Sequence, residues 1–190
     1  MSSATAERAE AARLPDGDAI AVLLNQHARI RDLFATVRAT RGDERRQAFD
    51  ELRALLAVHE VAEELVVRPV AKDIAGKDEA DARNHEEAEA TEVLKRLEKA
   101  DLDSAEFEAD FAQFERAVGD HADHEENEEF PALLRECSQE RRQAMGERLL
   151  RAERMAPTHP HPTAAGKPAA LALTGPFAAM MDKARDAMSR

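Results

Sequence analysis

Apolar residues recur along this chain at the three- and four-residue spacing of amphipathic helices, and the alternation of β-branched residues typical of strands is missing. The segments with this helical pattern cover residues 18–40, 44–73, 79–99 and 103–134. The connections between them are short. Helices joined by short loops pack antiparallel around a common core, so we predict an all-α protein built on a four-helix bundle.

Boundary residues indicate where these helices begin or end. Asp16 or Asp18 is the candidate N-cap of the first helix. Asp103 and Glu106 have the spacing of a capping box at the start of the fourth. Pro69 lacks the amide that would donate to the preceding turn, so the second helix is predicted to kink or end there.

The bundle is expected to lie within a domain spanning residues 16–155, with flanking segments on both sides. Residues 1–15 are expected to be a disordered N-terminus. A further helix, with Ser138 as its N-cap, is expected to cover the bundle. Residues 156–175 form a Pro- and Ala-rich linker, and residues 176–190 regain the periodicity of a short, Met-rich amphipathic helix.

Composition and charge narrow the classes of function. The chain of 190 residues has 27 Lys and Arg against 39 Asp and Glu, a formal charge of -12, and no basic cluster, so we expect no nucleic-acid partner. Its single cysteine, Cys137, excludes a disulfide framework and a cysteine-based zinc site. No apolar run reaches membrane-spanning length, so we expect a cytoplasmic protein without membrane association, either a monomer or a homodimer.

One pattern of eleven residues, H-x-x-x-E-E-x-x-x-x-P, occurs twice, beginning at His59 and again at His121. Residues four apart on a helix share a face, so each copy brings an imidazole and a carboxylate together. The pairs are His59 with Glu63 and His121 with Glu125. This spacing suits two ligands of one metal ion, and it predicts a metal site on the second and fourth helices.

Further polar residues fall on the apolar stripes of the other two helices. They are His27 on the first helix and His85 and Glu89 on the third. Counting from the predicted loops at about 1.5 Å per residue places all of these residues near one midplane layer. The candidate metal ligands are His27, His59, Glu63, His85, Glu89, His121 and Glu125.

Burying several carboxylates in one layer of a core is costly unless cations compensate them. Seven nitrogen and oxygen donors exceed what a single tetrahedral zinc needs, and they suit a pair of iron or manganese ions. No serine or cysteine nucleophile accompanies them, so we assign no catalytic side chain and no organic cofactor site.

Some of these assignments have plain alternatives. The third helix is rich in glutamate, so Glu89 could equally be a solvated charge, and His124 is expected to lie outside the ligand set. The neighbouring carboxylates are expected to face solvent; they are Glu60, Glu64, Glu126 and Glu129. A function of a different class is a non-catalytic helical adaptor that docks a partner through the Met-rich terminal helix.

Single histidines on the first and third helices, with the repeated motif on the second and fourth, resemble the hemerythrin-like family, also called HHE cation-binding domains, over about residues 18–134. The resemblance implies an up-and-down four-helix bundle, here with a C-terminal helical extension. It also implies a non-haem, oxo- and carboxylate-bridged pair of iron ions, with manganese as the alternative metal. The implied ligand positions are His27, His59, Glu63, His85, His121 and Glu125.

The chain departs from the oxygen-carrying hemerythrins at two positions. Those proteins have H-x-x-x-H on the third helix, where this chain has Glu89 as the second residue, and H-x-x-x-x-D on the fourth, where it has Glu125. Additional carboxylate oxygen stabilises the ferric state and lowers the reduction potential. The resemblance therefore implies a protein that acts on or senses O2, NO or peroxide, or handles iron, with catalase- or peroxidase-like activity as one form of it.

Overall fold

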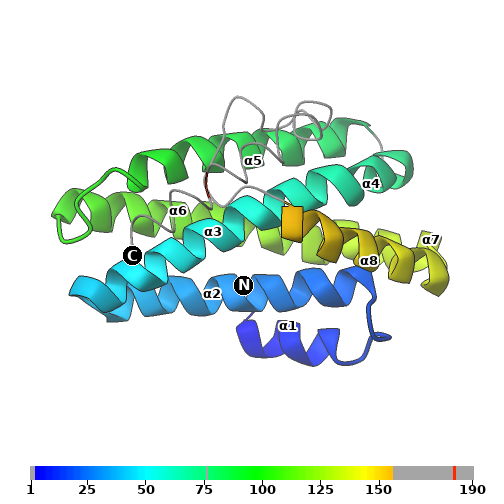
Figure 1. Ribbon diagram of the computed structural model, residues 1–190. Helices are drawn as coiled ribbons and strands as arrows, with labels where there is room; N and C mark the ends of the chain where they lie inside the picture. The colour runs from blue at the N-terminus through cyan, green and yellow to red at the C-terminus, as the bar shows by residue number, and fades with distance from the viewer. Residues whose placement is uncertain (1–2, 76, 156–181, 183–190) are drawn as a thin grey trace.

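The computed structural model describes residues 3–75, 77–155 and 182, and the chain is helical over most of these ranges, with no strand in them (Figure 1). The α-helices are α1 (Ala4–Ala11), α2 (Ala19–Ala39), α3 (Gly42–Val66), α4 (Arg68–Ala75), α5 (Lys77–Leu97), α6 (Ala105–His124), α7 (Phe130–Glu136) and α8 (Gln139–Met155), and a π-helix, η1 (Glu125–Glu129), joins α6 to α7. The prediction of an all-α bundle is confirmed.

Four long helical stretches form the bundle. The helices α2 and α3 lie side by side, and α5 and α6 form the second pair. Beyond a turn α4 continues the path of α3, and η1 and α7 continue that of α6 (Figure 1). The helix α8 begins directly after Ser138, whose hydroxyl accepts a hydrogen bond from the amide of Arg141 at 3.3 Å, and it packs against α2 and α3.

The core consists of two apolar clusters, and a polar layer lies between them. One cluster, where α4, α7 and α8 meet, contains Leu24 of α2 and Leu133 of α7. The other contains Ile30 of α2 and an aromatic group made of Phe34, Phe49, Phe107, Phe111 and Phe114. His27 lies on α2 between Leu24 of one cluster and Ile30 of the other. His121 lies on the stretch formed by α6, η1 and α7, between Phe114 and Phe130, which belong to different clusters. On these two stretches the alternation of apolar blocks therefore fixes the depth of the polar residues.

Two helix boundaries were predicted from the sequence only approximately. The break expected at Pro69 is present, but α3 ends three residues earlier, and Pro69 lies in the first turn of α4, where its missing amide costs no hydrogen bond. The N-cap of α6 is Ser104, one residue after Asp103, and its hydroxyl accepts from the amide of Phe107 at 3.1 Å. A hydroxyl cap of α6 thus replaces the expected capping box.

Residues 4–11, expected from the sequence to be disordered, form the helix α1, and the expectation is corrected here. The Ser3 hydroxyl caps the helix. The buried carboxylate of Glu7 accepts a hydrogen bond from Arg31 Nε of α2 at 2.5 Å, and Arg31 also reaches Asp123 Oδ1 of α6 at 2.9 Å. This short helix has a weak apolar stripe, so an ion pair with the bundle contributes to its stability, which periodicity alone does not reveal.

Asp18 joins the start of α2 to α8. One of its carboxylate oxygens accepts from the amide of Ile20 at 3.1 Å and caps α2, and the other accepts from Arg142 Nε at 2.8 Å. Farther along α8, Gly146 lies against the backbone of Gly17, because a Cβ at this position would be 2.0 Å from the Gly17 carbonyl oxygen. The two segments therefore pack with almost no space between their backbones.

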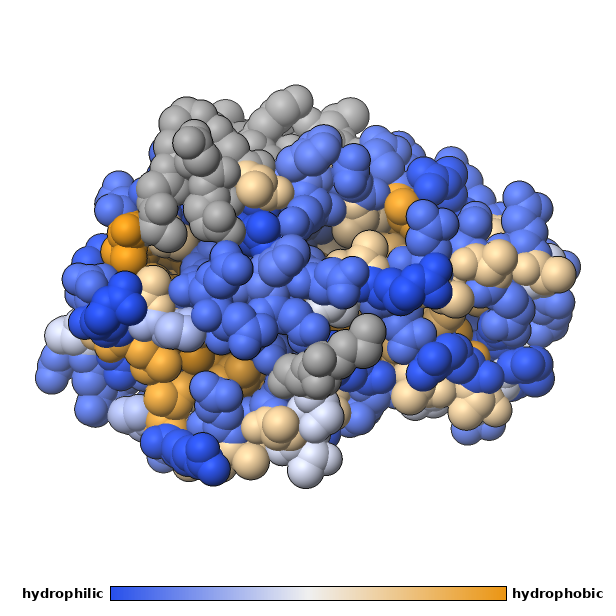
Figure 2. All heavy atoms as spheres, turned by 180° about the vertical axis from the view of Figure 1, so that it is seen from behind, coloured by the Kyte–Doolittle hydropathy of each residue, from blue (hydrophilic) through white to orange (hydrophobic). Residues whose placement is uncertain are grey.

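The surface is largely polar. Figure 2 shows mostly hydrophilic residues on the face opposite to that of Figure 1. Among the residues that the structure describes, Leu150 is the one large apolar side chain that is exposed, at 39%. None of the described helices has the length and apolar composition that a membrane span requires. The predicted linker and terminal helix, residues 156–190, lie outside the described residues except for Asp182.

Candidate metal centre

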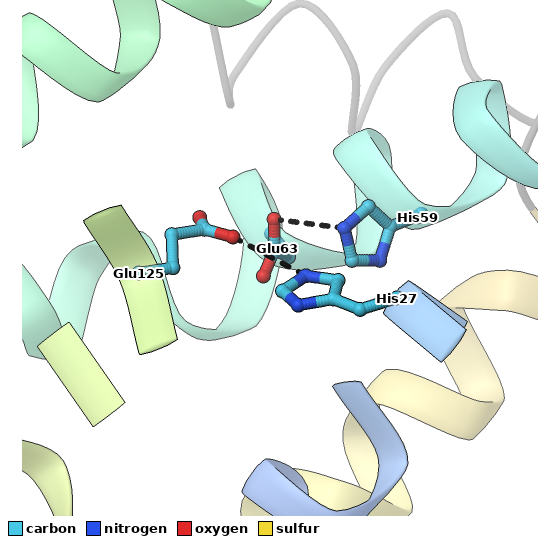
Figure 3. A group of neighbouring side chains, drawn as sticks. All are labelled: His27, His59, Glu63 and Glu125. Carbon is cyan, nitrogen blue, oxygen red and sulfur yellow. Dashed lines mark ion pairs between the residues drawn. The ribbon is translucent and has the colours of Figure 1, made fainter. Parts of the chain in front are cut away.

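Buried imidazoles and carboxylates converge in the polar layer from all four stretches of the bundle. One group consists of His27, His59, Glu63 and Glu125, each with a donor atom within 4.8 Å of the others (Figure 3). A second group with the same spacing consists of Glu63, Glu87, His121 and Glu125. Glu63 and Glu125 belong to both groups, so the layer holds two adjoining sets of metal-type donors.

In the first group each histidine points its Nε2 atom at a carboxylate. His27 Nε2 lies 3.4 Å from Glu125 Oε2, and His59 Nε2 lies 3.5 Å from Glu63 Oε2, as the dashed lines of Figure 3 mark. All four side chains are almost completely buried. These contacts place four donors around one small buried space.

The other ring nitrogens of these two histidines are hydrogen-bonded elsewhere. His27 Nδ1 lies 2.9 Å from Glu126 Oε1, and His59 Nδ1 lies 2.7 Å from the Gln26 side-chain oxygen. A histidine that donates from Nδ1 keeps the Nε2 lone pair for a ligand bond, and an acceptor behind the ring fixes its orientation. Glu126 and Gln26 therefore aim both rings into the first group.

The second group is built around His121. Its Nε2 atom lies 3.3 Å from Glu125 Oε1 and 3.9 Å from Glu87 Oε1. Its Nδ1 atom lies 2.9 Å from Glu86 Oε2. His121 thus has the same arrangement as the other two histidines, with Nε2 inward and Nδ1 on an acceptor.

Several donor atoms in this layer are buried without a hydrogen bond to any of the described residues. They are His27 Nε2, both oxygens of Glu63, and Oε2 of Glu87 and of Glu125. Unsatisfied buried polar atoms are rare in folded proteins and costly. Cations bound in the two groups would satisfy these atoms, and nitrogen and oxygen donors without thiolate suit iron or manganese. The residues present therefore fit the pair of metal ions predicted from the sequence.

The two histidines of the first group differ in protonation. Burial, together with the positive charge of His27, lowers the pKa of His59 to about 3. The His59 ring is therefore neutral, which is the state that binds a metal. Burial alone would lower the pKa of His27 as well, but Glu125 and Glu126, which face its ring, raise it to about 9. In the absence of a cation, a proton on His27 compensates part of the carboxylate charge.

The shared carboxylates also differ. Burial, and then repulsion from Glu125, raises the pKa of Glu63 well above its usual range. Burial would do the same to Glu125, but His121 and then His27 and Arg68 hold its pKa well below that range. Of the two shared carboxylates, Glu125 is therefore the one whose charged form the surrounding cations favour.

One of those cations, Arg68, has its side chain only 4% exposed. Its Nη1 atom donates to Glu129 Oε2 at 2.8 Å, and its Nη2 atom donates to Glu125 Oε1 at 3.2 Å and also to Glu87. Burial alone would lower the pKa of Arg68, but these carboxylates, Glu87 foremost, raise it. The guanidinium therefore remains charged at the edge of the second group.

The structure brings five of the seven predicted ligands into the layer, namely His27, His59, Glu63, His121 and Glu125. It does not bring in His85 and Glu89, whose side chains are 75% and 71% exposed and pair with each other at 3.3 Å. The buried face of α5 instead carries Glu87, in line with Leu94. Packing of Leu94 and Leu97 sets the rotation of α5, and their positions place His85 and Glu89 on its outer side. His124, with its side chain 47% exposed, lies outside both groups.

Several polar residues around the layer were not predicted from the sequence. The neighbouring carboxylates were expected to be solvated, yet Glu64 is buried, Glu129 is buried against Arg68, Glu126 contacts His27, and Glu60 accepts a hydrogen bond from the Thr91 hydroxyl at 2.7 Å. Glu125 and Glu129, at 0% and 4% exposed, are four residues apart and share a face, so the spacing that pairs His121 with Glu125 could also have identified Glu129. Both residues lie in the π-helical turn η1, and such turns are common at functional sites.

A cavity of about 320 Å³ adjoins the layer. Its walls include His59 and His121 on the polar side and Phe34 and Phe114 on the apolar side. Ser3, which precedes α1, also lines it. Small molecules can therefore reach the donor atoms through a space that is partly apolar.

Comparisons with known proteins agree with this geometry. Residues 18–133 match the family described as Hemerythrin HHE cation binding domain. The chain is 32% identical over 138 residues to a protein of Schizosaccharomyces pombe named as an uncharacterised hemerythrin-like protein, covering 71% of this chain and 68% of that one. No solved structure matches the chain.

Proposed function

Because the chain belongs to the hemerythrin HHE cation-binding family, we propose that its polar layer binds two iron ions, with manganese as the alternative metal. One observation carries the proposal most directly: buried nitrogen and oxygen atoms converge from all four stretches of the bundle without hydrogen bonds among the described residues. Cation binding is common to the family, and the two adjoining donor groups support a pair of ions.

In this proposal the chain's residues hold the ions and orient one another. His27 and His59 serve one ion, Glu87 and His121 serve the other, and Glu63 and Glu125 belong to both groups. Glu86, Glu126 and Gln26 keep the imidazole rings in position through their Nδ1 atoms. Bound iron would supply redox chemistry and coordination positions for a small ligand.

We propose that this ligand is O2, NO or peroxide, and that turnover of peroxide is favoured over reversible carriage of oxygen. The donor set contains three carboxylates, Glu63, Glu87 and Glu125, and carboxylate ligands stabilise the ferric state. The adjoining cavity gives a small molecule access to the layer. The two buried core clusters exclude bulk water from the ends of the layer.

The proposal is tested by reconstituting the chelator-treated full chain with Fe²⁺ under anaerobic conditions, and by measuring iron per chain, the optical spectrum and peroxide consumption. We expect two iron ions per chain and loss of at least one in His59→Ala, because this change removes a donor from the first group. His124→Ala is the matched control, since His124 lies outside both groups, and it should retain both ions.

A single bound zinc, or no metal after reconstitution, would refute the proposed centre. Equal loss of iron in His59→Ala and His124→Ala would refute the assignment of ligands. A stable, reversible adduct with O2 and no consumption of peroxide would reverse the proposed order of activities.

A further inference from the structure

The two copies of the repeated motif differ at the residue before their shared proline. In the first copy this residue is Arg68, before Pro69, and in the second copy it is Phe130, before Pro131. Both side chains turn inward, at 4% and 2% exposed. A charged residue and an apolar residue thus occupy equivalent positions beside the two donor groups.

Phe130 lies against the first group. Its ring stacks on that of His27, with the ring centroids 5.7 Å apart and the planes at 18°. Because Phe130 is uncharged, this contact orients the imidazole without competing for the carboxylates. In the first group Arg68 contacts only the shared Glu125, so a cation bound there competes with one arginine contact.

Arg68 lies against the second group and already occupies its carboxylates. Its guanidinium bonds to Glu87 and Glu125, two of the four members of that group, and Glu129 holds its other end at 2.8 Å. Arginine does not release its proton in proteins, so this charge can be removed from the group only by movement of the side chain. The second group is thus already partly neutralised by the chain itself.

We propose that Arg68 makes the two halves of the centre unequal, so that the group with His27 and His59 binds its cation first and tightly. The group with Glu87 and His121 then binds a second cation more weakly, in competition with the Arg68 guanidinium. This inference rests on the proposed two-ion centre. It assigns Arg68 as a positioning residue that holds Glu87 and Glu125 in the metal-free chain and sets the order of loading.

Two physical effects act in the same direction. A divalent ion placed among Glu87 and Glu125 is repelled by a guanidinium a few ångströms away, and this repulsion is strong in a buried layer. The ion must also replace hydrogen bonds that the two carboxylates already make. Neither effect acts on the first group to the same extent, because the Nη atoms of Arg68 contact just one of its members, Glu125.

The test is a titration of the metal-free full chain with Co²⁺, followed by calorimetry and by the visible absorption of the bound ion. For the wild-type chain we expect two steps whose dissociation constants differ at least about tenfold. In Arg68→Met the ratio of the two constants should shrink at least about tenfold, through tighter binding of the second ion. Arg68→Lys keeps the charge and should retain most of the separation.

Two further variants keep the test decisive. Phe130→Leu changes the equivalent residue of the other copy and should leave the second step unchanged. Arg68→Gln is a second neutral variant that can still hydrogen-bond to the carboxylates, and circular dichroism of each metal-free variant reports whether the bundle has formed.

Two equal binding steps in the wild-type chain, or an unchanged or larger ratio in the folded neutral variants, would overturn the role of Arg68 while leaving the two-ion centre standing. The same shift in Arg68→Lys as in Arg68→Met would show that charge is not the cause, and would also overturn it. A wild-type chain that bound no ion would instead refute the proposed function itself.

Discussion

Replacing Glu63 with methionine should make the metal-free chain more stable and at the same time impair its metal binding. Glu63 is 1% exposed, and neither of its carboxylate oxygens has a hydrogen-bond partner among the described residues. Methionine has a similar length and volume but no oxygen to leave unsatisfied. The substitution therefore removes the free-energy cost of an unsatisfied buried carboxyl group, which the chain retains because the group is needed to bind metal.

The magnitude follows from the cost of an unsatisfied buried group, about 1–3 kcal/mol. For a chain of this size that corresponds to about 2–4 °C in Tm per kcal/mol. The pKa of Glu63 is higher in the folded chain than its ordinary value of 4.5, so the folded chain retains a proton there that the unfolded chain releases. The destabilisation by Glu63 therefore grows as the pH rises above its ordinary pKa, and the gain from methionine should shrink towards about pH 4.

The assay is urea and thermal unfolding of the chelator-treated wild-type chain and Glu63→Met at neutral and acidic pH, repeated with added Co²⁺. The metal should raise the Tm of the wild-type chain and have a much smaller effect on the variant, because Glu63 belongs to both donor groups. Glu89→Met is the control, since Glu89 is exposed and should change neither property. A metal-free Glu63→Met chain less stable than the wild type at neutral pH would refute the reasoning.

Two further predictions concern the packing of α8. Asp18→Ala should destabilise the chain by about 3 kcal/mol or more in urea unfolding, because it leaves the largely buried Arg142 without its carboxylate and removes the cap of α2. Asp18→Asn, which keeps an acceptor for the cap, should cost less, and equal losses would contradict this account. Gly146→Ala should lower the Tm through a cost of about 1–3 kcal/mol, because its Cβ would meet the backbone of Gly17; an unchanged Tm would show that α8 shifts freely.

Sequence periodicity was sufficient to predict the bundle and the depth of the polar layer. On α2, His27 is flanked by apolar blocks that become the two core clusters, and the pairs begun by His59 and His121 have a spacing that a regular helix turns into contacts. Those residues stand out because each one interrupts an otherwise apolar stripe.

On α5 the same reasoning chose the wrong face, because few apolar residues fix the rotation of a helix so rich in glutamate. Whether Glu87 or Glu89 faces the core depends on how Leu94 packs against the opposite helices, and this packing cannot be inferred from a single sequence. Arg68 was missed for a related reason. Its burial depends on three carboxylates from α5 and η1, and such a cluster becomes visible only when the helices are assembled. The helix α1 depends in the same way on a partner, Arg31, in the bundle.

The polar layer between the two apolar clusters also bears on how the bundle opens. A continuous hydrophobic core makes a bundle unfold as one cooperative unit, whereas an interruption by ionisable groups allows the two ends to behave as separate units that open at different free energies. Between the aromatic cluster and the cluster near α8, the layer contains ion pairs such as those of His27 and Arg68 with Glu125. A cation bound to side chains from several helices would tie these two units together. Metal occupancy would then determine whether the two ends of the bundle unfold separately or together.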